Sequence, residues 1–438
     1  MKTLNIIDIN KYIDKDILVD AVVDNIRSLA YVIFIILRDS SGKVQVTIEK
    51  SDENMLDILK TLEYLTCEST VKIKGKVQVN EHVKLGGYEI IPTSIEVTSL
   101  SDNELPIDIK NKDNAFRETR LDYRFLDLRR SDNNLFFKCQ TFIESKMREY
   151  WINNNYMEIH TPKISSKAAE SGAEEFKLDY FGETAVLSQS PQFYKQMAIS
   201  SGFEKVFEIG TVYRAENSHT SYHACEIEMI DSEIGYIDSY EEVMDEEEKM
   251  IKYFMTSLKE KYGDKIKNEF NTEVSDVTEN FPRINFYDAK NIIKDKYNYI
   301  SITKEDFDRH DEELICSYAK NEYNSDFVFI TNYPYSARSF YIMKDKDGIT
   351  QSFDLLFKGL EITSGGQREH RYDVLKKQIV EKGIDPSVLD FYIEFFKYGC
   401  APHGGYGLGM ARLMMKIFNI DNVREATFLY RGPTRLRP

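Results

Sequence analysis

The stretch Val206–Glu233, with the sequence VFEIGTVYRAENSHTSYHACEIEMIDSE, is the part of the chain from which the fold is best approached. Two apolar runs, Val206–Tyr213 and Cys225–Ile230, flank the polar segment Arg214–His223, and this order predicts a strand, a long loop and a returning strand. An arginine at the end of a buried strand suits a nucleotide phosphate, because its planar guanidinium can bridge two phosphate oxygens. A surface hairpin with ordinary charges is the alternative that these residues leave open.

The composition is that of a soluble globular protein with a sizeable core. The chain has 438 residues, of which 42% are hydrophobic and 30% are charged, enough for two or three domains. Its five cysteines are scattered and form no CxxC pair, which argues against a zinc knuckle or a disulfide framework and indicates a reducing compartment. No apolar run approaches the roughly 20 residues of a membrane span, and the N-terminus lacks a signal-peptide core. We therefore expect a cytoplasmic protein with no membrane partner.

The chain is strongly acidic. A net charge of −16 argues against nucleic acid as a partner, but it is a global sum that a local basic face can accompany. Much of the excess acid lies in Tyr240–Glu248, YEEVMDEEE, within a helical pattern over residues 237–263. We expect this acidic run to be a solvated helix face.

The first hundred residues are rich in strand signals. A helical segment lies near Asn54–Tyr64, and Gly86-Gly87 marks a turn. The predicted strands are Ile17–Val23, Tyr31–Leu37, Lys43–Ile48, Thr70–Val77 and Tyr88–Val97. Five short strands and one helix favour a small β-barrel of the OB type, although another small barrel fits the composition nearly as well. A polar segment that begins at Leu105-Pro106 indicates a domain boundary.

Four stretches together resemble one family. FRETRLDYRFLDLRR at Phe116–Arg130 is nearly a verbatim family signature, and Val206–Glu233 resembles motif 2 of the class II aminoacyl-tRNA synthetases. The helical pattern Asn134–Asn153 and the following strand that ends at Pro162 resemble motif 1, and HGGYGLGMARL at His403–Leu413 resembles motif 3. The resemblance covers nearly the whole chain and is closest to the aspartyl branch in its shorter, archaeal-like form.

The resemblance implies an α+β fold in two functional parts. Residues 1–104 would form an OB-fold anticodon-binding domain, residues 105–131 a linker or hinge, and residues 132–438 a class II catalytic domain with an antiparallel sheet flanked by helices. Motif 1 would form the interface of a homodimer, although an ordinary core helix and edge strand explain the same residues. The implied activity is an aspartate–tRNA ligase, which joins L-aspartate to tRNA(Asp), with tRNA(Asn) as a further acceptor to be considered.

Formation of an aminoacyl-adenylate joins a carboxylate to the α-phosphate of ATP and expels pyrophosphate. The carboxylate is already ionised at neutral pH, so catalysis requires positioning and charge stabilisation by arginines and Mg²⁺. By resemblance, the catalytic residues are Arg214, Arg412 and Glu361. The implied ATP-binding residues are Arg214, Glu216, Tyr222, His223, Ile227, Glu361, Gly409 and Arg412.

Two departures from the family pattern concern ATP. Ile227 stands where the family usually has a phenylalanine that stacks on adenine, so we expect weaker stacking. Ala411 stands where the family has a glutamate before the motif 3 arginine, so Arg412 would lack the partner that orients it. We expect these departures to reduce activity rather than abolish it.

Asp354 and Glu361 lie seven residues apart in an apolar context. If they lie on adjacent antiparallel strands, their oxygens could share a cation, and hard oxygen ligands select Mg²⁺. The resemblance places Glu361 and Ser364 on the metal with Asp354 in support. Two separate surface acids are the alternative.

The implied aspartate-binding residues are Glu170, Gln192, Lys195, Arg214, Ser364, Arg368 and His403. Lys195 beside Arg368 would receive the second negative charge of aspartate, and a neutral asparagine would leave these cations unpaired. The segment ESGAEEF, Glu170–Phe176, leans instead toward the asparaginyl branch. The rival interpretations are therefore an asparagine–tRNA ligase and a paralogue that activates or senses an amino acid outside translation.

Phe34 and Gln45 resemble the stacking and hydrogen-bonding pair with which the family reads the anticodon. Alternation along the strand also permits Phe34 to be an ordinary core residue. Ala21-Val22-Val23 replaces the family's GWV near the start of the barrel, which leaves the choice of anticodon open.

Overall fold

The computed structural model describes residues 4–166 and 174–438. The chain divides into two compact units, residues 1–114 and residues 115–438. Two short helices, α2 (Arg117–Asp122) and α3 (Arg124–Asp127), fall in the second unit. The segment 105–131, which the sequence predicts as a linker, is thus divided between the two units.

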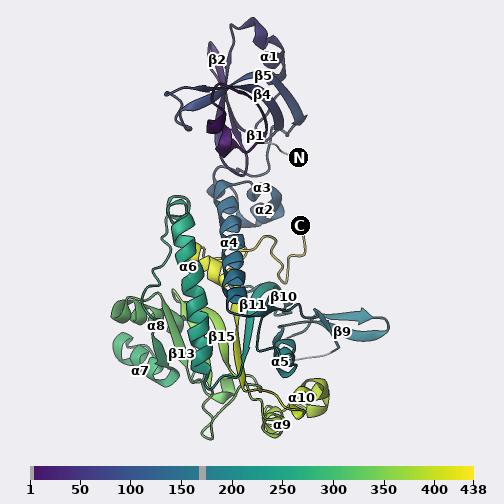
Figure 1. Ribbon diagram of the computed structural model, residues 1–438, viewed down its shortest axis with the longest axis vertical. Coiled ribbons are helices and arrows are strands. Elements are labelled where there is room, and N and C mark those ends of the chain that lie inside the picture. The colour runs from purple at the N-terminus through teal and green to yellow at the C-terminus, as the bar shows by residue number, and fades with distance from the viewer. Residues whose placement is uncertain (1–3, 167–173) are drawn as a thin grey trace. The chain divides into compact units, whose positions relative to one another are not determined.

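The first unit is a closed barrel with the strand order β1-β2-β3-β5-β4 (Figure 1). Its elements are β1 (Asp16–Ser28), β2 (Val32–Arg38), β3 (Lys43–Glu49), α1 (Leu56–Leu62), β4 (Thr70–Val79) and β5 (Tyr88–Ser99). Alternate residues of β2 and β3 are buried, as expected for strands with one face in a core. The predicted strands and the helix between the third and fourth of them are confirmed.

The second unit is built on an eight-stranded sheet with the order β12-β13-β14-β15-β16-β11-β10-β6. Its strands are β6 (Met157–Glu158), β10 (Lys205–Tyr213), β11 (Glu226–Gly235), β12 (Arg283–Asn285), β13 (Phe327–Thr331), β14 (Ser352–Phe357), β15 (Glu361–Gln367) and β16 (His403–Gly409). The central pairs are antiparallel, and only the two edge pairs, β12 with β13 and β6 with β10, are parallel. A smaller sheet contains β7 (Ile164–Ser165), β9 (Glu183–Leu187) and β8 (Lys177–Tyr180). The predicted α+β class with an antiparallel catalytic sheet is confirmed.

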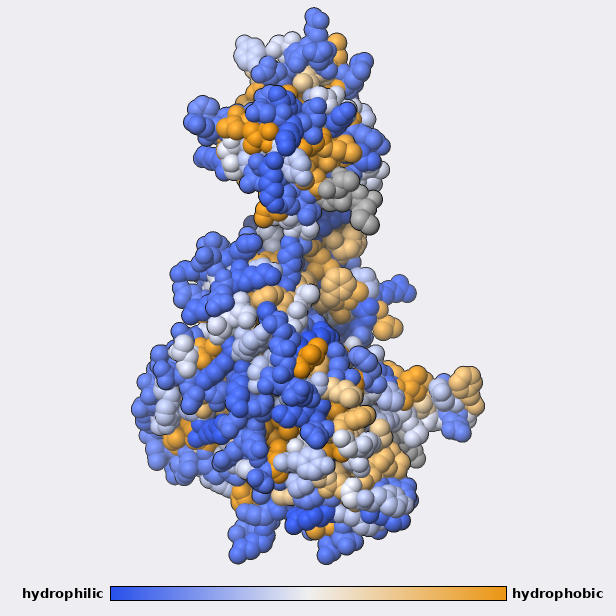
Figure 2. All heavy atoms as spheres, in the orientation of Figure 1, coloured by the Kyte–Doolittle hydropathy of each residue, from blue (hydrophilic) through white to orange (hydrophobic). Residues whose placement is uncertain are grey.

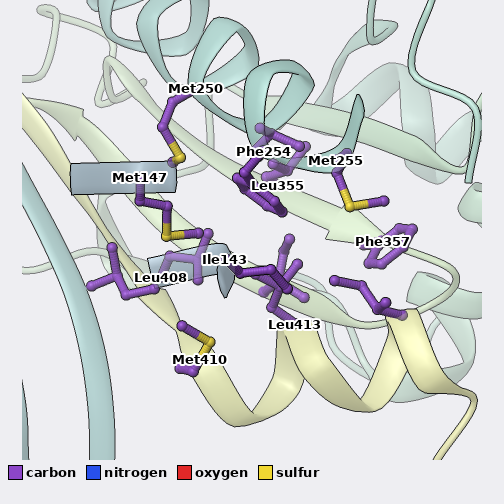
Figure 3. Close-up of a cluster of buried hydrophobic side chains, with 14 of the residues drawn as sticks. Ile143, Met147, Met250, Phe254, Met255, Leu355, Phe357, Leu408, Met410 and Leu413 are labelled. Atoms are coloured by element: carbon purple, nitrogen blue, oxygen red, sulfur yellow. The ribbon is translucent and has the colours of Figure 1, made fainter. Parts of the chain in front are cut away.

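Three helices close one face of the large sheet: α4 (Ser131–Asn153), α6 (Tyr240–Phe270) and α11 (Met410–Phe418). Figure 3 shows side chains from these helices converging with Leu355, Phe357 and Leu408 of the strands. The remaining helices are α5 (Gln192–Ser200), α7 (Phe286–Tyr297), α8 (Arg309–Tyr323), α9 (Tyr372–Glu381) and α10 (Asp390–Lys397). Because side chains alternate along a strand, the covered face leaves the opposite side chains of β11, β15 and β16 available to a site.

The acidic run at the start of α6 is only partly solvated. Ser239 caps this helix in a capping box with Glu242, so the helix begins where its first carboxylates are favourable. Glu247 is completely buried, and Glu248 is 7% exposed and paired with Lys252 at 2.9 Å. The expectation that the whole run is solvated is therefore wrong for its last two acids.

The molecular surface is mainly hydrophilic with scattered apolar patches on the face shown in Figure 2, as the charged composition leads one to expect. Among the described residues, no helix is both long and apolar enough to cross a membrane.

Candidate active site

The predicted strand, loop and returning strand are β10, the segment from Arg214 to Cys225, and β11. The two strands pair in antiparallel register from Lys205 with Ile234 to Tyr213 with Glu226. The backbone N–H of Arg214 donates to the carbonyl of Cys225 at 2.9 Å, which closes the base of the loop. Arg214 therefore leaves the sheet at a fixed point.

A cavity of about 670 Å³ opens at this point and brings Arg214, Arg412 and Glu361 together. Its volume is in the range of small-molecule sites. Other predicted residues in its wall are Glu216, Tyr222, His223, Ile227, Ser364 and Gly409. The alternative of a surface hairpin with ordinary charges does not hold, because residues far apart in the sequence line one hollow with it.

Arg412 has a partner despite the alanine that precedes it. Its Nη1 donates to the backbone carbonyl of Glu361 at 3.1 Å and lies 3.8 Å from Oε1 of the same residue. The expectation that Ala411 leaves this arginine without an orienting partner is therefore wrong. The first turn of α11 and the first residue of β15 orient the guanidinium instead.

Helix α8 supports the loop and the sheet at the same time. The guanidinium of Arg309 lies 4.6 Å from the ring centroid of Tyr222 and donates to the Tyr222 hydroxyl at 3.3 Å. Arg309 also donates to Glu312 at 3.0 Å, and Glu312 accepts the backbone N–H of Glu361 at 3.1 Å. No sequence pattern pointed to this link, because residues 264–345 carry no recognisable chemical motif.

Asp354 and Ser364 are directly opposite each other on β14 and β15, and Glu361 lies on the same β15 strand beyond a register shift. Asp354 is 3% exposed, while Glu361 faces the cavity, so the alternative of two separate surface acids does not hold. Burial and then the neighbouring Asp354 carboxylate raise the pKa of Glu361 to about 8. Two acids in this position favour a cation between them.

The donor set fits magnesium without forming a closed cage of ligands. Within residues 4–166 and 174–438, no three His, Cys, Asp or Glu side chains gather so as to hold a metal ion. Mg²⁺ needs no such cage, because it keeps several waters and is usually bound by one or two carboxylates and substrate phosphates. In the same described residues, Oδ1 of Asp354 is buried without a hydrogen-bond partner, which is the state expected of an atom that awaits a cation.

A second cavity of about 250 Å³ adjoins the first and is lined by Gln192, Arg214, Ser364 and Arg368. Arg214 and Ser364 belong to both cavities. A small carboxylic acid in the second cavity would therefore lie next to a nucleotide in the first. Of the predicted residues that the structure describes, Asp354, Lys195 and His403 line neither cavity, and Glu170 lies outside the described residues.

The two predicted cations of the second cavity are already paired. Lys195 Nζ lies 2.9 Å from Asp231 Oδ1 and 3.4 Å from Glu233 Oε2, and Arg368 donates to Glu233 from Nε at 2.9 Å and from Nη2 at 3.2 Å. Burial acts to raise the pKa of Glu233, but the charges of Arg368 and Lys195 outweigh it and hold that pKa below its ordinary value. The expectation that a neutral asparagine would leave these two cations unpaired is therefore wrong. Asp231, which the sequence analysis missed, lines the cavity in place of Lys195.

His403 acts behind the cavity. Its Nδ1 donates to the carbonyl of Ala401 at 2.8 Å, which leaves Nε2 to accept from Gln196 at 2.9 Å. Gln196 in turn accepts from Gln192 at 3.0 Å. Burial lowers the pKa of His403 to about 4, so the imidazole is neutral and this chain of hydrogen bonds orients Gln192.

On the barrel, Phe34 and Gln45 lie on the outer face. Their strand neighbours Ile33, Ile35 and Val44 are buried, whereas Phe34 and Gln45 are half-buried. The alternative of Phe34 as a core residue does not hold. Gln45 donates to Glu89 at 3.0 Å. The sequence analysis did not single out Glu89, which is 7% exposed on β5.

Comparison with known families gives two matches. The model of class II tRNA synthetases (D, K and N) matches residues 116–431, and the model of the OB-fold nucleic acid binding domain matches residues 17–98. The aspartate–tRNA(Asp) ligase of Pyrococcus abyssi is 42% identical over 419 residues, 95% of this chain and 94% of that protein. The aspartate–tRNA(Asp/Asn) ligase of Aeropyrum pernix is 40% identical over 416 residues, 94% of this chain and 93% of that protein.

Solved structures give the same fold along the whole chain. The asparaginyl-tRNA synthetase of Pyrococcus horikoshii complexed with asparaginyl-adenylate superposes with a TM-score of 0.92 at 28% identity and covers 100% of both chains. The aspartyl-tRNA synthetase of Entamoeba histolytica has a TM-score of 0.89 at 31% identity, over 100% of this chain and 93% of that one.

Proposed function

The chain belongs to the class II tRNA synthetases, and from this premise we propose that it is an aspartate–tRNA ligase. The observation that carries the proposal is the convergence of Arg214, Arg412 and Glu361 on one cavity that adjoins a smaller cavity with Arg368 in its wall. Class II synthetases use ATP and a divalent metal. Here ATP would occupy the larger cavity and aspartate the smaller one.

The first step is in-line attack of the aspartate α-carboxylate on the α-phosphate of ATP. The carboxylate oxygen forms the new P–O bond, and the bond to the pyrophosphate oxygen breaks. Arg214, which belongs to both cavities, contacts the two reacting anions and reduces their repulsion. Arg412, held by the Glu361 carbonyl, contacts the outer phosphates. The terminal adenosine of tRNA then takes the aspartyl group from the adenylate and AMP leaves.

Glu361 and Ser364, with Asp354 in support, would hold Mg²⁺. The donor set suits that ion, and when bound it supplies positive charge to the phosphate oxygens.

Choice of aspartate rests on Arg368. A guanidinium has five N–H donors, and two of those of Arg368 serve Glu233, which leaves others for the aspartate side-chain carboxylate. Lys195 supports this arrangement by compensating Asp231 and Glu233. Asp231 in the cavity wall suits the substrate ammonium group.

The barrel would read the anticodon of tRNA(Asp) with Phe34 and Gln45, which lie on its outer face. The two relatives differ in whether their names include tRNA(Asn) as an acceptor. A charging assay with both tRNAs tests whether this chain also uses tRNA(Asn). The enzyme would act as a homodimer through α4 and β6, the segment that resembles motif 1. All five cysteines are free, which supports a reducing compartment such as the cytoplasm.

Aspartate-dependent exchange of labelled pyrophosphate into ATP tests the proposal. We expect exchange with aspartate and little with asparagine, followed by charging of tRNA(Asp). Exchange with asparagine alone would identify an asparagine–tRNA ligase. Adenylate formation without charging of any tRNA would identify an activating paralogue, and no exchange with either amino acid would reject the proposed enzyme.

A further inference from the structure

Arg338 lies in the wall of the smaller cavity but was not singled out by any motif. It follows the short turn Tyr335–Ala337 and lines the smaller cavity. Its guanidinium lies 3.7 Å from the ring centroid of Tyr333, which is 1% exposed, so the side chain is held on a rigid aromatic support. A side chain held in this way presents its donors in fixed directions.

Those donors go to two residues that face each other across β14 and β15. Nη2 donates to Asp354 Oδ2 at 2.6 Å, and Nη1 donates to Ser364 Oγ at 3.2 Å. Asp354 and Ser364 are directly paired in the strand register. One guanidinium therefore bridges two of the three residues to which we assign the magnesium ion.

The contacts with Arg338 leave one acceptor on Asp354 and one on Ser364 available to a cation. In the part of the chain that the structure describes, Oδ1 of Asp354 is buried without a hydrogen-bond partner, while Oδ2 is engaged by Arg338. The Ser364 hydroxyl accepts from Arg338 with one lone pair and retains another. Arg338 thus engages one carboxylate oxygen of Asp354 and one lone pair of Ser364, and it leaves the other carboxylate oxygen and the other lone pair available to a metal.

We propose that Arg338 is a positioning residue of the metal site, which holds Asp354 and Ser364 in ligand geometry before the nucleotide and its metal arrive. This inference rests on the proposed function and deepens it. Partners that orient metal ligands in this way typically change metal affinity about 10–100-fold when they are removed. Arg338 acts through Asp354 and Ser364 and is not required to touch ATP.

The test uses Mn²⁺ in place of Mg²⁺ and measures its binding to the full-length enzyme by electron paramagnetic resonance, in the presence of a non-hydrolysable ATP analogue. We expect Arg338→Met to weaken Mn²⁺ binding about 10–100-fold. Arg338→Lys retains the charge but cannot bridge both residues, and we expect an intermediate loss. Unchanged or tighter Mn²⁺ binding in either variant would overturn the proposal, because it would mean that the arginine is only structural or competes with the metal.

Two further variants separate this role from general damage. Arg371 is also ion-paired, at 2.7 Å to Glu369, but it lies outside both cavities, so Arg371→Met should leave Mn²⁺ binding unchanged. Once Asp354→Asn has removed the carboxylate, adding Arg338→Met should cost little more, and fully additive losses would contradict action through Asp354. Pyrophosphate exchange by the wild-type enzyme is measured alongside: if it is absent, the proposed function fails, whereas exchange with unaltered metal binding in the variants rejects only the role of Arg338.

Discussion

The two adjoining cavities hold their charges in different ways. In the larger cavity the corresponding contacts are long: Arg412 lies 3.8 Å from Glu361, and His223 lies 3.7 Å from Glu216. At the smaller cavity, Arg368 in the wall and Lys195 behind it each lie 2.9 Å from a buried carboxylate. Under the proposed function, the larger cavity would receive charges from a nucleotide and a metal. At the smaller cavity the charge of Arg368 is already balanced by Glu233, and its remaining N–H donors would recognise the ligand.

Arg214 belongs to both cavities, so its removal should have the largest effect. We expect Arg214→Ala to lower the rate of pyrophosphate exchange by about 10³-fold, because one guanidinium serves both reacting anions. Steady-state exchange at varied ATP and aspartate checks this. Arg214→Lys should recover only part of the rate, since an ammonium cannot form the bidentate contact. A loss confined to the KM of one substrate would contradict the shared role.

Glu233→Gln removes a negative charge that balances Lys195 and Arg368 at the smaller cavity. It leaves Lys195 and Arg368 with less than their full counter-charge in a completely buried position, so we expect a loss of stability on the order of 3 kcal/mol. Urea unfolding measures this change, and Glu204→Gln on the surface is the matched control. An unchanged unfolding midpoint would show that the buried pairs do not stabilise the fold.

Glu361→Gln in the larger cavity should reduce pyrophosphate exchange without reducing the stability of the fold. The pKa of Glu361 is about 8 without a metal, so the folded protein already holds this group mostly protonated at neutral pH, and the neutral substitution should not lower stability. Pyrophosphate exchange should fall by about 10²-fold, because a ligand for the cation is lost. A destabilisation as large as that of Glu233→Gln would remove the distinction between the cavities.

A second buried carboxylate lies on the other face of β15, where Glu247 of α6 is completely buried next to Thr363. Burial raises its pKa from 4.5 to about 8. The folded state therefore keeps a proton that the unfolded state has lost, so the stabilisation is complete below pH 4.5 and declines as the pH rises toward 8. Relative to wild type, we expect Glu247→Gln to become progressively more stable over this range.

Denaturant unfolding at several pH values measures the difference between Glu247→Gln and wild type. Glu260→Gln, on the exposed side of the same helix, is the control and should follow the wild-type curve. A difference that is independent of pH would mean that Glu247 does not titrate in this range.

The smallest effect concerns the adenine. We expect Ile227→Phe to strengthen ATP binding by about 0.5–1.5 kcal/mol, because it supplies an aromatic ring at the position where the family usually has one. The KM for ATP in the exchange assay should fall, while the KM for aspartate in the other cavity should not change. Ile227→Leu keeps the apolar contact without a ring and should leave both values near those of wild type.

The sequence predicted what lies in contiguous motifs. The barrel strands, the hairpin around Arg214 and the shared position of Arg412 and Glu361 all follow from local patterns and a family resemblance. Asp231 and Glu233 were missed although they had a signal: they alternate with Ile230 and lie on the cavity side of β11. The sequence could not show that Asp231 and Glu233 pair with Lys195 and Arg368, because this depends on which helix and strand pack against β11 in the fold.

Glu247, Arg309 and Arg338 show which functional features the sequence could and could not predict. Glu247 lies four residues from both Val243 and Ile251, which are buried, so helical periodicity already placed it on the buried face. The composition of the acidic run concealed this. Arg309 and Arg338 had no comparable signal, because their partners lie across the tertiary structure and neither occurs in a repeated pattern or a recognisable motif.

The neutral histidine behind the smaller cavity has a consequence for how the enzyme would respond to a change in its surroundings. Since the pKa of His403 is about 4, mild acidification adds no proton to it, and the direction of its hydrogen bond with Gln196 is preserved. The orientation of Gln192, and with it the proposed binding of the amino acid, would then persist through mild acidification, under which an exposed imidazole in the same place would change its charge.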